Sequence, residues 1–158
     1  MDKATRQEKI LELIYSQNIT TQEDLVKALA EQGIEVAQAT ISRDIKELNI
    51  LKVNLRDGRQ KFVALRPQSE SGTKRLLKVF SEAVRSSSLA GNILVIHTLA
   101  GMAPACASAV DALCIPAVAG CIAGDDTIFV AIKSGSDVLR VEAEIMQFAT
   151  YVEEDKED

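Results

Sequence analysis

Residues Gly120-Cys-Ile-Ala-Gly-Asp-Asp-Thr-Ile-Phe-Val-Ala-Ile132 hold two apolar runs on either side of a cluster of turn-forming residues. This spacing predicts a strand–turn–strand hairpin, with Gly124 free to adopt a positive φ in the turn. Asp125 and Asp126 then lie side by side at the tip. Because neighbouring carboxylates repel, the pair is typical either of a cation-binding site or of two solvated turn residues. Both interpretations fit the spacing.

The composition favours an aliphatic protein of one or two small domains. The chain has 158 residues, of which 47% are hydrophobic and only 4% aromatic, with no Trp. That is enough apolar material for a packed core, but it disfavours aromatic platforms for base stacking. No apolar run is long enough to cross a bilayer and no signal segment opens the chain, so we expect a cytoplasmic protein.

Cysteine and histidine are too sparse to indicate a metal centre. Cys106, Cys114 and Cys121 are spaced seven or eight residues apart without a C-x-x-C pair, and His97 is the only histidine. A zinc site is therefore disfavoured, and we expect reduced thiols and a buried structural histidine. The sequence also shows no combination of a nucleophile and a base that would indicate an enzyme.

The charge of the chain is divided unevenly between its two halves. The net charge is −5, but residues 1–66 hold 11 Lys and Arg against 10 Asp and Glu, whereas residues 67–158 hold 7 against 13. Within residues 43–66 the ratio is 7 basic to 3 acidic. A basic patch on an acidic protein indicates two modules with different electrostatic roles.

The first module has the pattern of a helix-turn-helix. Apolar residues recur at helical spacing over residues 5–16, 22–31 and 37–48, and Gly33 ends the second of these segments. In the third segment Ile41 and Ile45 face the core. The opposite stripe carries side chains that suit base edges and phosphates, although an ordinary solvated face would also fit: Gln38, Ser42, Arg43 and Lys46.

A basic hairpin follows the third helix. The runs 50–55 and 60–65 are joined by Arg56-Asp57-Gly58-Arg59, and Asp-Gly between apolar runs is a strong hairpin signal. Lys61 lies close to the same tip. Residues 1–66 are therefore predicted to form a winged helix-turn-helix domain, with its third helix in the DNA major groove and Arg56, Arg59 and Lys61 on the backbone.

The second module is predicted to be an α+β domain. Residues 67–73 lack apolar side chains and are interpreted as a linker, and the acidic tail 153–158 is expected to be disordered. Between them, residues 74–152 predict the order αβαββα. Its elements are a helix over 74–86, a strand over 93–98, a helix over 102–113, the acidic hairpin, and a helix over 137–148.

Three motifs resemble the bacterial arginine repressor family. Gln38-Ala-Thr-Ile-Ser-Arg-Asp-Ile-Lys-Glu-Leu48 is similar to its recognition helix. Gly91-Asn-Ile-Leu-Val-Ile-His-Thr98 and Gly124-Asp-Asp-Thr-Ile128 are similar to its effector-domain motifs. The resemblance covers nearly the whole chain in the same order. It implies a regulator without enzymatic activity, a hexamer made of two trimers, L-arginine as corepressor, and operator DNA near arginine-metabolism genes.

The resemblance also implies roles for single residues. Ser42 and Arg43 would contact DNA, assisted by Gln38 and Thr40. Carboxylates would hold the cationic groups of arginine, since a guanidinium fits a carboxylate as a planar fork of donors. The implied effector residues are Ala103, Asp111, Asp125, Asp126 and Thr127.

One stretch departs from the family pattern. Leu99-Ala100-Gly101-Met102-Ala103-Pro104 has Ala in place of a Pro, and Pro104 stands where relatives have a ligand-contacting Gln. Loss of such a hydrogen bond costs about 0.5–1.5 kcal/mol. A related cationic amino acid such as ornithine, or no effector at all, therefore remains an alternative.

A rival hypothesis is a small metal-dependent enzyme that uses Asp111 with the acidic pair.

Overall fold

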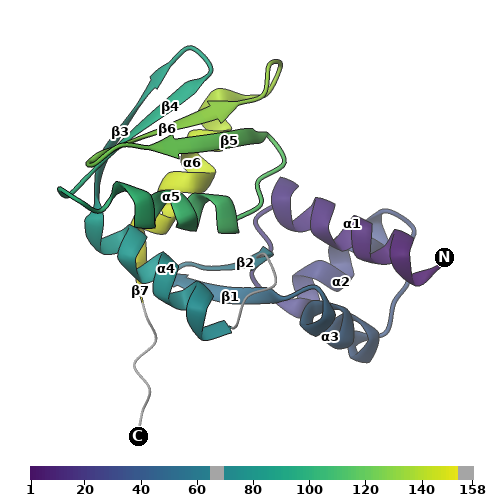
Figure 1. Ribbon diagram of the computed structural model, residues 1–158. Coiled ribbons are helices and arrows are strands. Elements are labelled where there is room, and N and C mark those ends of the chain that lie inside the picture. The colour runs from purple at the N-terminus through teal and green to yellow at the C-terminus, as the bar shows by residue number, and fades with distance from the viewer. Residues whose placement is uncertain (65–69, 153–158) are drawn as a thin grey trace, which may run out of the picture.

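The computed structural model describes residues 1–64 and 70–152 (Figure 1). The N-terminal domain has the predicted three helices and hairpin, and its first and third helices differ from prediction by one or two residues at their ends. The elements are α1 (Lys3–Ser16), α2 (Gln22–Glu31), α3 (Gln38–Glu47), β1 (Ile50–Leu55) and β2 (Gln60–Ala64).

Local sequence signals set the ends of α2. The Thr21 side chain accepts from the Asp24 amide, and the Asp24 carboxylate accepts from the Thr21 amide, which forms a capping box. After the helix, Gly33 adopts a φ of 78°, a conformation that costs a glycine little. The three helices close around a core in which Ile10, Leu25 and Ile41 are fully buried.

The C-terminal domain is an α+β fold, as predicted, but with two strands that were not predicted. Its order is αββαββα, followed by a 3₁₀ turn and a short strand. The elements are α4 (Glu70–Ala83), β3 (Val84–Ala90), β4 (Ile93–Thr98), α5 (Ala103–Ala112), β5 (Val118–Ala123), β6 (Thr127–Ile132), α6 (Val138–Met146), η1 (Gln147–Thr150) and β7 (Tyr151–Val152).

The predicted order αβαββα was wrong because β3 was assigned in part to the preceding helix. Val84-Arg-Ser-Ser-Ser-Leu-Ala90 is an edge strand whose side chains are mostly exposed, so it lacks the apolar alternation of a half-buried strand. Its backbone pairing with β4 defines it instead. The helix α4 also begins earlier than predicted, at Glu70, within the segment 67–73 that was interpreted as a linker. Periodicity detects only helical turns with an apolar face. Residues 67–69 and the tail 153–158 lie outside the described residues.

The four-stranded sheet is antiparallel, in the order β3-β4-β6-β5. On one face Leu94, Ile96 and Val130 are fully buried in a single core with residues of α4, α5 and α6. On the other face Ile122 and Phe129 lie directly opposite each other and are 73% and 51% exposed. The sheet therefore has one covered face and one open apolar face.

His97 lies on the open face and is exposed, so the expected buried histidine was wrong. Successive side chains of a strand alternate between faces, and the inward positions of β4 beside it are taken by Ile96 and Thr98. An apolar run therefore located the strand, but it did not tell which face each residue occupies.

The two domains share a sheet and a core. β7, near the end of the chain, pairs antiparallel with β1 of the wing to give the sheet order β2-β1-β7. Val53 and Val63 of the wing are buried in the core cluster of the C-terminal domain, together with Phe80 and Phe148. The wing is thus packed into the second domain.

We expect the burial of leucines in the C-terminal domain to decide their contribution to stability. Leu77→Ala, at a side chain that is 2% exposed, should lower the free energy of unfolding by about 2–5 kcal/mol. Leu139→Ala, at a side chain that is 69% exposed, should change it by about 0.5 kcal/mol or less. Urea unfolding followed by circular dichroism measures both, and equal losses would contradict the described core.

Candidate functional site

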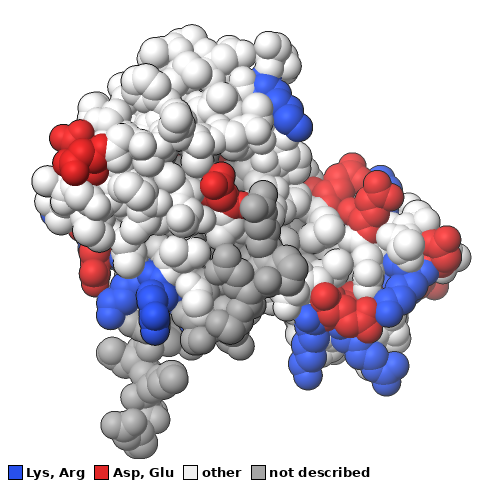
Figure 2. Space-filling model, viewed as in Figure 1, with Lys and Arg blue, Asp and Glu red and all other residues white. Residues whose placement is uncertain are grey.

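The solvent-facing side of α3 is polar and basic. Gln38, Arg43 and Lys46 are exposed, and Thr40 and Ser42 are half-buried. Figure 2 shows basic side chains gathered at the end of the N-terminal domain where α3 lies in Figure 1. The described structure therefore leaves Gln38, Arg43 and Lys46 accessible to a large partner, with Ser42 partly covered beside them.

A buried ion pair that the sequence pattern missed holds α3 in place. Asp44 is 2% exposed and accepts from Arg6 Nε at 2.6 Å, from Arg6 Nη2 at 3.1 Å and from Gln7 Nε2 at 3.0 Å. The Arg6 guanidinium holds the pKa of Asp44 below its ordinary value. The available signal was the position of Asp44, three residues after Ile41 and next to Ile45 on the inner face of the helix.

The basic residues of the wing do not all share one environment. Arg56 and Arg59 are exposed at the turn, where Gly58 has a φ of 83°. The Arg56 amide donates to the Thr150 carbonyl at 2.6 Å, which fixes the turn to the C-terminal domain. Lys61 instead is half-buried between the domains, and burial lowers its pKa.

The acidic turn is held rigidly by main-chain hydrogen bonds. The Thr98 amide donates to the Asp126 carbonyl at 2.8 Å, and the Ala103 amide donates to the Asp125 carbonyl at 3.1 Å. The Gly101 amide also donates to Asp125 Oδ2 at 3.2 Å. Both carboxylates are nevertheless exposed. The turn therefore presents two neighbouring negative charges beside the start of α5.

One detail of this turn differs from expectation. Gly124 is not among the residues with positive φ, and its amide donates to the Thr127 carbonyl at 2.8 Å just beyond the end of β5. Thr127 begins β6, and its hydroxyl donates to Asp126 Oδ1 at 3.0 Å. The threonine thus orients one of the two acids.

Asp111 does not lie beside the acidic pair in the folded chain. It is on the last turn of α5, about 12 Å along the helix from Ala103 at a rise of 1.5 Å per residue. Ala103 is fully buried at the first turn, next to Asp125. Over residues 1–64 and 70–152 no three His, Cys, Asp or Glu residues are grouped to hold a metal ion. The metal site of the rival hypothesis is thus not assembled here.

Asp111 has a neighbour that the sequence did not indicate. Cys121 Sγ donates to Asp111 Oδ1 at 3.3 Å. Burial, together with this carboxylate, raises the pKa of Cys121 to about 12. The thiol therefore stays protonated as a hydrogen-bond donor. All three cysteines are free, and Cys106 alone is fully buried.

The fold and the exposed surface of α3 define a two-domain, DNA-binding transcription regulator. The family model "Arginine repressor, DNA binding domain" matches residues 1–70, and "Arginine repressor, C-terminal domain" matches residues 80–147. The chain belongs to the arginine repressor family and is not an enzyme. Of the described helices, none has the length and apolar character needed to span a membrane.

Three curated relatives, each named arginine repressor, illustrate the match. The protein from Caldicellulosiruptor saccharolyticus is 48% identical over 134 residues, which cover 85% of this chain and 88% of that protein. The protein from Acetivibrio thermocellus is 48% identical over 132 residues, covering 84% and 86%. The protein from Alkaliphilus metalliredigens is 46% identical over 140 residues, covering 89% and 94%.

We expect the ion pair of Asp44 with Arg6 to make the free energy of unfolding depend on pH. The folded-state pKa of Asp44 lies below its ordinary value of 3.8. The contribution of the ion pair to the free energy of unfolding is therefore complete above pH 3.8, and it is lost as the pH falls through the folded-state pKa. Asp44→Asn should lower the free energy of unfolding by about 3 kcal/mol at pH 7, because Arg6 loses its charged partner.

Urea unfolding of the protein and of Asp44→Asn between pH 7 and pH 3 tests this expectation. The difference between them should shrink toward the acidic end. Glu31→Gln, at an exposed residue of α2, is the control. A difference that stays constant over the whole range would contradict the assignment to this ion pair.

Proposed function

We propose that the protein is an arginine-dependent transcriptional regulator that binds operator DNA of arginine biosynthesis or catabolism genes as a hexamer in the cytoplasm. The observation that carries the proposal is the combination of an accessible polar face on α3 with an anchored, exposed acidic turn in the second domain. Membership of the arginine repressor family supports both halves of it.

The α3 surface suits the DNA major groove. Arg43 can donate two hydrogen bonds to a guanine edge, Gln38 can pair with an adenine edge, and Ser42 fits either a base or a phosphate. Lys46 and the exposed wing residues Arg56 and Arg59 carry charge for the phosphate backbone. The Arg6–Asp44 pair supports this role because it fixes the inner face of α3 and leaves the outer face to DNA.

The acidic turn suits a small cation held between subunits. Asp125 and Asp126 repel each other, and a guanidinium placed against them would relieve that repulsion with paired hydrogen bonds. Asp111 lies too far along α5 to reach the same ligand within one protomer. If Asp111 also binds arginine, it must come from another copy, and arginine would then strengthen the assembly.

The open face of the sheet supports self-association. Ile122 and Phe129 form an exposed apolar pair across β5 and β6, near the acidic turn, and contiguous apolar surface of this kind marks interaction sites. We propose that this face is covered within the trimer. Assembly then brings several DNA-binding domains together, so that paired half-sites are bound at high effective concentration.

A second candidate effector is ornithine or another cationic amino acid. Pro104 is exposed in the first turn of α5, beside the acidic turn, and has no side-chain donor or acceptor. The contact that a Gln would make is therefore absent from this position. A shorter cation could still use the two carboxylates. Comparing arginine and ornithine in the same calorimetric titration distinguishes the two effectors.

We expect Arg43→Ala to abolish specific binding to operator DNA, because it removes a bidentate base contact worth about 1–3 kcal/mol of discrimination. The oligomer should remain intact, since Arg43 is exposed on α3. DNase footprinting and sedimentation measure the two properties. Arg85→Ala, at an exposed arginine of β3, is the control, and an unchanged footprint for Arg43→Ala would refute the assignment.

We expect Asp126→Asn to remove the arginine response while the fold is kept. Asn retains the size of Asp and an oxygen that can accept from Thr127, but it loses the charge that attracts a guanidinium. A charged hydrogen bond of this kind contributes about 1.5–3 kcal/mol, so affinity for arginine should fall by roughly tenfold or more. Calorimetry measures it, with Glu82→Gln on α4 as control. An unaltered response would remove the acidic turn from the site.

A further inference from the structure

The end of α1 is capped by a residue from the other domain. The last carbonyls of a helix have no partner within it, and a positive charge is favourable at this end. The last turn of α1 has no basic residue of its own. Arg140 of α6 supplies one: its Nη2 donates to the Ser16 carbonyl at 2.7 Å and to the Tyr15 carbonyl at 3.3 Å.

The Arg140 side chain is itself held in position. Its Nε lies 3.4 Å from Glu144 Oε1, one helical turn further along α6. Its amide donates to Asp137 Oδ1 at 3.2 Å at the start of the helix. The guanidinium is thus paired with a carboxylate of its own helix, whose start is capped, while it also contacts α1. An arginine placed in this way can transmit the orientation of α6 to the N-terminal domain.

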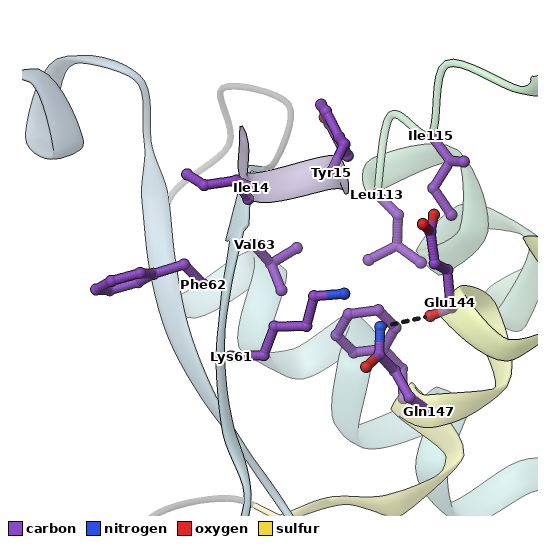
Figure 3. A pocket seen from close by; sticks show the side chains of 10 residues that line it. Ile14, Tyr15, Lys61, Phe62, Val63, Leu113, Ile115, Glu144 and Gln147 are labelled. Carbon is purple, nitrogen blue, oxygen red and sulfur yellow. Dashed lines mark hydrogen bonds between the residues drawn. The ribbon is translucent and has the colours of Figure 1, made fainter. Parts of the chain in front are cut away.

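Lys61 enters the same seam from the wing. Figure 3 shows it extending from β2 toward Glu144 and Gln147 of the C-terminal domain. The cavity among these side chains has a volume of only about 20 Å³, so the two domains are in close contact there. Lys61 and Glu144 both line this cavity, and burial there lowers the pKa of Lys61 while the negative charge of Glu144 opposes that effect.

The other side of the wing is fixed by backbone contacts. β7 pairs with β1 at Asn54 and Leu55, and the Arg56 amide donates to the Thr150 carbonyl. Residues 140–152 therefore contact the N-terminal domain at two separated places, the end of α1 and the tip of the wing. The contact at the end of α1 lies outside the shared sheet and core of the wing, so it adds a separate restraint on rotation of the three-helix part of the N-terminal domain.

We infer that Arg140 is a positioning residue that fixes the orientation of the recognition helix α3 on the effector domain. The ion pair of Arg6 with Asp44 connects α1 to α3, so a cap on α1 also constrains α3. In an assembly of several copies, this constraint sets the distance and rotation between recognition helices. It thereby selects operators by the spacing of their half-sites. The inference rests on the proposed function for its DNA readout.

The test compares Arg140→Met with the wild-type protein on operators whose two half-sites are in phase, or are shifted by about half a helical turn, roughly 5 base pairs. Methionine keeps much of the apolar stem and loses every donor. The wild-type protein should prefer the in-phase operator by about tenfold or more, because only that spacing permits simultaneous engagement. Arg140→Met should lose most of this preference, with unchanged affinity for a single half-site.

Two further variants make the result specific. Arg140→Lys retains the charge and a donor, so it should restore part of the spacing preference. Arg85→Met, at an exposed arginine of β3, makes the same chemical change away from the seam and should behave as wild type. If Arg140→Met keeps the full wild-type preference, or if Arg85→Met loses it equally, the positioning role is refuted.

A readout without DNA separates this inference from the proposed function. The Arg56 amide is bonded to Thr150 across the domains, so its hydrogen exchange reports on the seam. Exchange at this amide should be faster in Arg140→Met than in wild type or Arg85→Met. If the wild-type protein fails to bind paired half-sites, the proposed function fails, and the exchange result still decides the inference. Unchanged exchange in Arg140→Met would overturn it.

Discussion

The pairing of β7 with β1 is the interaction on which the arrangement of the two domains depends. It brings the last described residues of the chain back to the wing and completes a three-stranded sheet made of both domains. Val53 and Val63 of the wing are buried in the core of the C-terminal domain. Strand pairing satisfies backbone groups at the β1 edge that would otherwise need water or another chain.

In the acidic turn, by contrast, the backbone fixes the position of two carboxylates without neutralising their charge. Main-chain bonds from Thr98, Gly101 and Ala103 hold Asp125 and Asp126 beside the start of α5. The helix N-terminus offsets part of their charge. The rest is left to solvent in a single protomer. A site that is rigid, exposed and electrostatically incomplete is well suited to a ligand shared between subunits, and this supports the proposed regulation by a cationic amino acid.

The basic residues of the N-terminal domain show that a sequence pattern locates a charged segment but does not tell which of its side chains are exposed. Arg43 and Lys46 are exposed on α3, and Arg56 and Arg59 are exposed at the wing turn, so the patch lies on the predicted elements. Lys61 is also positively charged and lies two residues from Arg59, yet it is half-buried against the other domain. Alternation along β2 and the docking of the wing, rather than charge, decide the difference.

The sequence by itself determined the three N-terminal helices, the wing, the acidic hairpin and the α+β class, because helical periodicity, apolar runs and turn residues are local signals. It also carried the recognition-helix motif that connects the chain to its family. Only the tertiary structure decided the strand β3, the pairing of β7 with the wing, the partner of Asp44 and the contact of Arg140 with α1. The contacts of Asp44 and Arg140 join residues that are 38 to 125 positions apart in the sequence, and β7 pairs with the distant wing. β3 pairs with its neighbour β4, but as an edge strand it lacks the apolar alternation that marks a strand in the sequence. All four features depend on backbone pairing or charge contacts, which local apolar periodicity does not record.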